Sequence, residues 1–199
     1  MKKIAHISDL HFGRVNESVA AGLLHDITRI GPDLIVVSGD LTQRARRAEF
    51  EKARAFLDQM HFPKLVVPGN HDIPLYDIIR RFLVPLKRYE EIITSGMMPL
   101  YLDNEIAVLG INTARSFTWK EGRISTEQIA EMKEKLCSLS PDLLKIVVTH
   151  HPFIPPPGSA GVQIVGRALR ALDIIDECAI DLLLAGHLHD AYSSDIRTY

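Results

Sequence analysis

The chain has 199 residues, of which 46% are hydrophobic and 24% are charged, and its formal net charge is −2. This composition is ordinary for a soluble globular protein, and the near-neutral charge excludes the strongly basic surface that non-specific binding of duplex nucleic acid requires. No apolar run approaches membrane-spanning length, so we expect no membrane partner. We treat residues 1–199 as one domain, because no linker or low-complexity tract interrupts them.

The cellular compartment of the protein is predicted from the first residues of the chain and from its cysteines. Asp9 follows the start of the chain too soon for the apolar core of a signal peptide. Cys137 and Cys178 lie in segments with helical spacing, and we interpret them as reduced, packed thiols rather than as a disulfide. Together these features predict a cytoplasmic protein.

Short apolar runs rich in Val, Ile and Leu recur along the chain. Such runs are typical of strands that are buried on both faces of a sheet. They predict strands over residues 3–8, 33–38, 64–67, 106–111, 144–149 and 181–185.

Longer segments between these runs have the spacing of amphipathic helices. We predict helices over residues 17–30, 46–60, 125–139 and 166–178. The third begins with a capping signal, because Ser125 is followed by Gln128 three residues later. Residues 76–103 are less regular and are interrupted by prolines. The alternation of strands and helices predicts a layered α/β fold.

Polar clusters follow most of the predicted strands. In open α/β sheets the carboxyl ends of strands line the crevice where ligands bind, so these residues should converge in space. Glycines 39, 69 and 186 lie beside the clusters and would let the backbone turn sharply there. Seven candidate metal ligands occur in the clusters: Asp9, His11, Asp40, Asn70, His150, His187 and His189.

The number and type of these ligands predict a site for two metal ions. Carboxylate and imidazole ligands suit Mn²⁺, Fe²⁺ or Fe³⁺, and Zn²⁺. A single structural zinc ion usually has about four ligands, so a larger set fits two ions that share a bridging carboxylate. Two such ions, with a hydroxide between them as the nucleophile, are suited to in-line displacement at a phosphoester.

The ordered set of motifs resembles the calcineurin-like metallophosphoesterase superfamily. The motifs are Asp9-Leu-His11, Gly39-Asp40, Gly69-Asn70-His71-Asp72, the later His150, and Gly186-His187-Leu-His189. The Gly-Asn-His-Asp form and His-His-Pro at 150–152 most resemble its class III cyclic-nucleotide phosphodiesterase branch. The resemblance spans nearly the whole chain and implies a four-layer α-β-β-α sandwich of mixed sheets.

The resemblance also implies a role for each motif residue. Asp9, His11, Asp40 and His189 would hold one ion, and Asp40, Asn70, His150 and His187 would hold the other. His71 would be catalytic without being a ligand: it would stabilise the phosphoryl oxygens or protonate the leaving alkoxide. Asp72 would orient the His71 ring.

The chain departs from the family pattern after the Gly-His-x-His turn. Members of the family usually continue with strands that finish the second sheet, whereas the residues after His189 leave room for about one return strand. We therefore expect a C-terminal part that is short or truncated. An unfinished sheet edge favours pairing with another chain, which would allow a homodimer.

Several alternatives stay open. A small phosphodiester, such as a cyclic nucleotide, is the expected substrate, but a phosphomonoesterase or a nucleotide pyrophosphatase would use the same metal chemistry. A non-catalytic scaffold of the same fold is a further alternative. His151 fits either a contact to substrate or a structural role, and Trp119 fits either a loop anchor or a stacking partner for a nucleobase.

Overall fold

Two β-sheets form the centre of the computed structural model, which describes residues 2–159, 161–162 and 164–195. The first sheet is parallel, in the order β1 (Ile4–Ile7), β2 (Leu34–Ser38) and β3 (Lys64–Val67). The second has the order β4 (Leu100–Leu102), β5 (Ile106–Gly110), β6 (Leu144–Val148) and β7 (Leu182–Leu184). In this sheet β4 is antiparallel to β5, and the other pairs are parallel.

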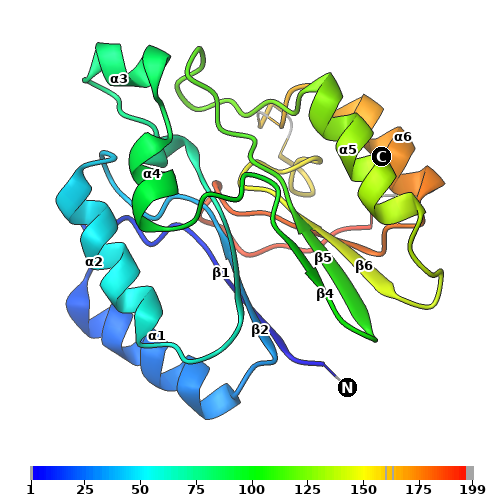
Figure 1. Cartoon of the computed structure of the whole chain (residues 1–199), viewed down its shortest axis with the longest axis horizontal. Coiled ribbons are helices and arrows are strands. Elements are labelled where there is room, and N and C mark those ends of the chain that lie inside the picture. Colours follow the sequence, from blue (N-terminus) through cyan, green and yellow to red (C-terminus); the bar gives the residue numbers. More distant parts are fainter. Residues whose placement is uncertain (1, 160, 163, 196–199) are drawn as a thin grey trace.

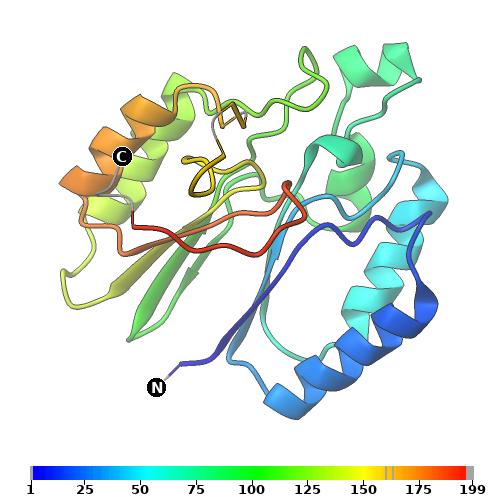
Figure 2. The ribbon, with the colours of Figure 1, turned by 180° about the vertical axis from the view of Figure 1, so that it is seen from behind.

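Helices cover both outer faces of the paired sheets. Figures 1 and 2 show α1 (Glu17–Ile30) and α2 (Arg47–Asp58) on the side of the first sheet, and α5 (Thr126–Cys137) and α6 (Ala168–Glu177) on the side of the second. Two shorter helices, α3 (Ile78–Leu83) and α4 (Lys87–Ile92), lie between β3 and β4 in the sequence. The layers are therefore α-β-β-α, as predicted.

The strands are apolar on consecutive residues because they are buried on both faces. In β2, Ile35 and Val37 belong to the core beneath α1 and α2. Their neighbours Leu34 and Val36 pack in the core between the two sheets, which also contains Val108 of β5. Each fully buried side chain of this size stabilises the fold by about 1.5–3 kcal/mol relative to an exposed one.

Most predicted elements are present, with ends that differ by a few residues. The capping signal is confirmed: the Ser125 hydroxyl accepts from the Gln128 N–H, and the Gln128 side chain accepts from the Ser125 N–H. Apart from a 3-10 helix of one turn over Asn70–Asp72, three elements of the described residues were not predicted: β4, α3 and α4. They are short and lie in the Pro-interrupted region 76–103, where periodicity carries little signal.

The end of the chain differs in part from the expectation of a return strand. Residues 191–195 form no strand, and the rest of that segment lies outside the described residues.

Among the helices of residues 2–159, 161–162 and 164–195, none combines the length and the apolarity that crossing a bilayer would need.

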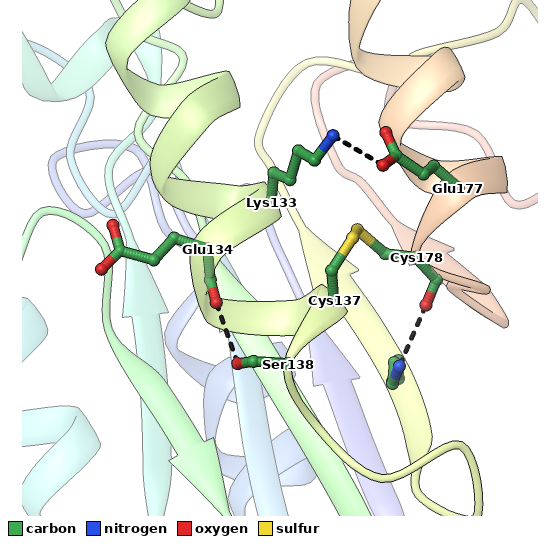
Figure 3. The surroundings of a disulfide bond; sticks show 7 residues. Lys133, Glu134, Cys137, Ser138, Glu177 and Cys178 are labelled. Atoms are coloured by element: carbon green, nitrogen blue, oxygen red, sulfur yellow. Dashed lines mark hydrogen bonds and ion pairs between the residues drawn. A yellow bond between two sulfur atoms is a disulfide. The ribbon is translucent and has the colours of Figure 1, made fainter.

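The prediction of reduced cysteines is wrong in this structure. Cys137, at the end of α5, and Cys178, which caps α6, form a disulfide with a Cα–Cα distance of 4.4 Å (Figure 3). The two helices pack side by side, and an ion pair between Lys133 of α5 and Glu177 of α6 also joins them, next to the disulfide. Helical spacing says nothing about which helices become neighbours. Since disulfides are rare in the cytosol, the cytoplasmic location loses one of its two supports and stays a prediction.

Candidate metal centre

The loops that follow the strands meet at one end of the two sheets. Backbone hydrogen bonds join neighbouring loops within each sheet: in the first sheet the Asp9 N–H donates to the Gly39 carbonyl, and in the second the Gly186 N–H donates to the His150 carbonyl. The first and last motifs also meet, since the His187 N–H donates to Asp9 Oδ2 at 3.0 Å. Residues separated by most of the chain are thereby brought together.

Five of the candidate ligands have left-handed backbone conformations, with φ between 46° and 75°: Asp9, His11, Asp40, His187 and His189. Asp and His adopt this region more readily than most residues, but it still costs free energy that the surrounding structure must offset. Such conformations cluster at functional sites. Here they let residues two apart in the sequence, such as His187 and His189, direct their side chains to different partners.

The motif glycines 39, 69 and 186 have no room for a side chain, as two of them illustrate. A Cβ at Gly39, where φ is +87°, would lie 2.6 Å from His150 Nδ1. A Cβ at Gly186 would lie 2.7 Å from Asp9 Oδ2. Both clashes involve candidate ligands, so these glycines allow the ligand side chains to occupy their positions.

The first cluster of candidate ligands contains Asp9, His11 and His189. The Nε2 atoms of His11 and His189 lie 3.2 Å apart, and His189 Nε2 lies 3.2 Å from Asp9 Oδ1. Asp9 Oδ1 is buried and has no hydrogen-bond partner within the described residues. Burying a carboxylate oxygen without a partner is costly, so this atom points to a cation between the three side chains.

The second cluster contains Asn70, His150 and His187. His150 Nε2 lies 3.1 Å from Asn70 Oδ1 and 3.3 Å from His187 Nδ1. The other ring nitrogen, His150 Nδ1, donates to the Ser38 carbonyl at 2.8 Å. That bond leaves Nε2 free to act as a ligand, in the manner usual for metal-bound histidine.

Asp40 lies between the two clusters. Its Oδ2 is 3.8 Å from His11 Nε2 and 3.3 Å from His150 Nε2, while its Oδ1 accepts from the His71 N–H. Only 1% of Asp40 is exposed. A buried carboxylate that faces both groups of imidazoles is suited to bridge two ions.

The buried groups shift one another's pKa values. Burial alone would raise the pKa of the Asp40 carboxyl, but the facing His150 ring reverses this and holds that pKa below its usual range. For His150, the Asp40 carboxylate overcomes burial and raises the pKa to about 9. Burial lowers the pKa of His187 to about 4. A metal ion binds only the neutral ring, so binding at His150 must release a proton.

The residues present fit a pair of metal ions. Every described group of at least three His, Asp, Cys or Glu ligand atoms in close reach lies at this site. The donors are imidazole nitrogens and carboxylate oxygens, with no thiolate, which suits Mn, Fe and Zn.

His71 lies beside the clusters, where the resemblance implied a catalytic residue. Its ring packs edge-on against that of His11, with a centroid separation of 4.9 Å. His71 Nδ1 donates to the Gln43 carbonyl at 3.0 Å, which fixes the ring and leaves Nε2 available. The sequence offered no signal for Gln43, because a backbone carbonyl supplies the contact.

Asp72 does not orient the His71 ring, contrary to the expectation. Its carboxylate is buried and accepts from the N–H groups of Gly69, Leu41 and Thr42 and from the Thr42 hydroxyl, at 2.9–3.2 Å. Burial raises the pKa of Asp72 to about 6 despite these bonds. Through these bonds the carboxylate joins the loops after β2 and β3. Asp72 is thus a positioning residue for the loops.

Of the two roles left open for His151, the structure supports the structural one. His151 Nε2 donates to the Lys120 carbonyl at 2.8 Å, so Nδ1 accepts from the Thr113 hydroxyl at 2.8 Å. Both ring nitrogens are occupied, and burial lowers the pKa of His151 to about 2. The ring ties the loop at 113–122 to the strand end beneath the site.

Trp119 in that loop is 67% exposed, so it does not anchor the loop in a core.

Comparison with known proteins identifies the family. Residues 2–191 match the family described as calcineurin-like phosphoesterase, and the chain therefore belongs to it. A probable cyclic nucleotide phosphodiesterase of a Synechococcus strain is 27% identical, over 95% of this chain and 74% of its own length. A cAMP/cGMP dual specificity phosphodiesterase of Mycobacterium tuberculosis is 29% identical, over 94% of this chain and 61% of its own length.

A solved structure confirms the fold class. A dimetal phosphatase from Danio rerio superposes with a TM-score of 0.70 at 14% identity, covering 98% of this chain and 84% of that one. The predicted resemblance and the predicted fold are both confirmed. The chain spans less than two thirds of the M. tuberculosis relative, at 61%.

Proposed function

We propose that the chain is a metal-dependent phosphodiesterase with a two-ion centre. The observation that carries the proposal is the position of Asp40, whose carboxylate oxygen Oδ2 faces both histidine clusters. A site for a single metal ion does not need a buried carboxylate that faces two ligand clusters. A site for phosphoester cleavage needs one, because two ions side by side stabilise the attacking and the leaving oxygen.

The two ions would have different ligand sets that share Asp40. One set is Asp9, His11, Asp40 and His189, and the other is Asp40, Asn70, His150 and His187. Mn²⁺, Fe²⁺ or Fe³⁺, and Zn²⁺ all suit these donors. When bound, the ions supply Lewis-acid stabilisation of the phosphoryl oxygens and make water more acidic.

His71 would serve the reaction from outside the ligand sets. Since Nδ1 keeps its proton for the Gln43 carbonyl, Nε2 is the atom that faces the chemistry. In the protonated ring, Nε2 donates a hydrogen bond to a phosphoryl oxygen and then transfers its proton to the leaving alkoxide. The Asp40 carboxylate also accepts a hydrogen bond from the His71 backbone N–H, so this bond positions the His71 ring relative to the proposed bridging ligand.

A small phosphodiester, such as a cyclic nucleotide, is the substrate class that we favour. Its support is the two relatives whose names describe cyclic-nucleotide phosphodiesterases. Phosphomonoesters and nucleotide pyrophosphates remain alternatives, because specificity in such enzymes depends on loops around a shared centre.

Parallel assays test the proposal. Purified chain is incubated with bis-p-nitrophenyl phosphate, p-nitrophenyl phosphate or cyclic AMP, each with and without added Mn²⁺. We expect Mn²⁺-dependent hydrolysis of the diesters that exceeds hydrolysis of the monoester. Faster cleavage of the monoester would favour the phosphomonoesterase alternative. Metal binding without any hydrolysis would favour a non-catalytic scaffold.

A further inference from the structure

A cavity of about 610 Å³ opens beside the His11–His189 side of the candidate metal centre. The part lined by His11, His71 and His189 of the centre is called its inner end here, and the part lined by the loop after β1 and by Val19 and Leu23 of α1 its outer end. The volume and the mainly apolar wall are typical of sites for small organic molecules. The metal chemistry accounts for the inner end and leaves the outer end without a role.

Arg14 supplies a cation to the outer end of this cavity. Its side chain lines the cavity and is exposed, and within the described part of the chain its guanidinium has no hydrogen bond or ion pair. Two other arginines, by contrast, are engaged. Arg29 at the far end of α1 pairs with Asp26, and Arg44 donates to the Gln43 carbonyl. Arg14 is therefore available to a ligand.

The loop that carries Arg14 is held rigidly against the first sheet. The Arg14 N–H donates to the His11 carbonyl at 2.9 Å, and the Phe12 N–H donates to the Leu41 carbonyl at 2.8 Å. The Gln43 N–H donates in return to the Phe12 carbonyl at 3.0 Å. The backbone of Arg14 is thus fixed relative to the centre, and less ordering is required when a ligand binds.

We propose that this cavity, the β1–α1 pocket, binds one organic substituent of the phosphodiester and selects a planar aromatic heterocycle such as a nucleobase. The inference rests on the proposed function, because the pocket shares His11, His71 and His189 with the metal centre. A guanidinium stacks on an aromatic face or donates to ring acceptors, and an apolar wall such as Val19 removes the ring from water. A small polar substituent, such as glycerol, gains little from either contact.

Two ligands that differ only in the base test the selection. Adenosine 5′-monophosphate and ribose 5-phosphate share the phosphate and the sugar, so the ratio of their affinities measures the contribution of the base. Calorimetry on the Mn²⁺-loaded chain gives this ratio without any turnover. We expect the nucleotide to bind about tenfold more tightly or better, as for a base held by one stacking contact.

Two variants test whether the preference for the ligand with a base arises from the pocket. Arg14→Ala removes the cation, and Val19→Trp fills the pocket; Val19 is 66% exposed, so the added volume does not strain the core. Both variants should bring the affinity ratio close to one. The matched controls Arg29→Ala and Ala21→Trp change exposed residues of α1 outside the pocket and should preserve the affinity ratio.

The outcomes separate the pocket from the catalytic proposal. Equal affinities for the two ligands in the unmodified chain, or a ratio that survives in both pocket variants, would overturn the inference. Neither result bears on diester hydrolysis. Conversely, absence of hydrolysis overturns the proposed function, whereas the affinity ratio still reports on the pocket.

Discussion

His187 and His189 are separated by one residue, yet their rings join different clusters. His187 Nδ1 lies 3.3 Å from His150 Nε2, and His189 Nε2 lies 3.2 Å from Asp9 Oδ1. On an extended segment, residues two apart face the same side. Here both histidines have left-handed backbones, with φ of 75° and 53°, and this breaks the alternation after the turn at Gly186.

This divergence predicts that each histidine serves a different ion. His189→Ala should lose the ion held with Asp9 and His11, and His187→Ala should lose the ion held with Asn70 and His150. Both variants should lose most activity, because the reaction needs both ions. Metal analysis and anomalous diffraction from Mn²⁺-loaded crystals of each variant would identify the ion that is lost. Loss of the same ion in both variants would contradict the split assignment.

His71→Ala should separate chemistry from metal binding. The ring is outside the proposed ligand sets, so metal content should not change. We expect kcat to fall by about 10²–10⁴-fold, the range for a general acid or a charge-stabilising group. The decrease should be smaller for a substrate with a good leaving group if proton transfer is the main role. A variant that fails to retain its metals would make His71 a ligand instead.

Asp72→Asn should act mainly on stability. The amide places N–H donors where the carboxylate accepts from Gly69, Leu41 and Thr42, and the buried mismatch should lower the free energy of unfolding by about 1.5–3 kcal/mol. Urea denaturation measures this change. The exposed control Asp26→Asn should be nearly neutral. If the variant kept full stability and lost kcat as severely as His71→Ala, the ring-orienting role would regain support.

Gly186→Ala should damage the centre, although it adds a single carbon. The new Cβ would lie 2.7 Å from both Asp9 Oδ2 and the Ser8 Cβ, so Asp9 must move. We expect weaker binding of the ion held by Asp9, measured by Mn²⁺ titration. Gly22→Ala is the matched control, because a Cβ there meets nothing within 4 Å, and its place in α1 should make the change stabilising by about 0.5–1 kcal/mol. Unchanged Mn²⁺ affinity in Gly186→Ala would show that Asp9 is dispensable.

The disulfide predicts a stability effect at the α5–α6 contact. Cys137 and Cys178 are separated by 41 residues, and closing a loop of this size should stabilise the fold by about 3–4 kcal/mol. Cys137→Ser should therefore lower the midpoint of denaturation, and reducing agent should have the same effect on the unmodified chain only. Alkylation of denatured, unreduced protein followed by mass spectrometry checks the bond directly. Two freely alkylated thiols would restore the prediction of reduced cysteines.

The sequence by itself determined the strands, the main helices and the set of residues at the site. Strands buried on both faces leave consecutive apolar residues, as in Leu34–Val37, and the α/β topology places the polar residues that follow most strands at the carboxyl ends of the sheets. These signals depend on residues that are close together in the sequence, so they can be recognised without the structure. The short elements β4, α3 and α4 carried no such signal.

Only the tertiary structure decided which atom of each residue meets which partner. The His150 ring is oriented by a carbonyl at Ser38, 112 residues away, and the His71 ring by a carbonyl at Gln43. Backbone carbonyls are present at every residue, so sequence cannot single them out. The same holds for Asp72, whose carboxylate accepts mainly from backbone N–H groups, and for Cys137 and Cys178, which meet because their helices pack together. Roles that depend on contacts between distant segments emerge only when packing brings those segments into reach.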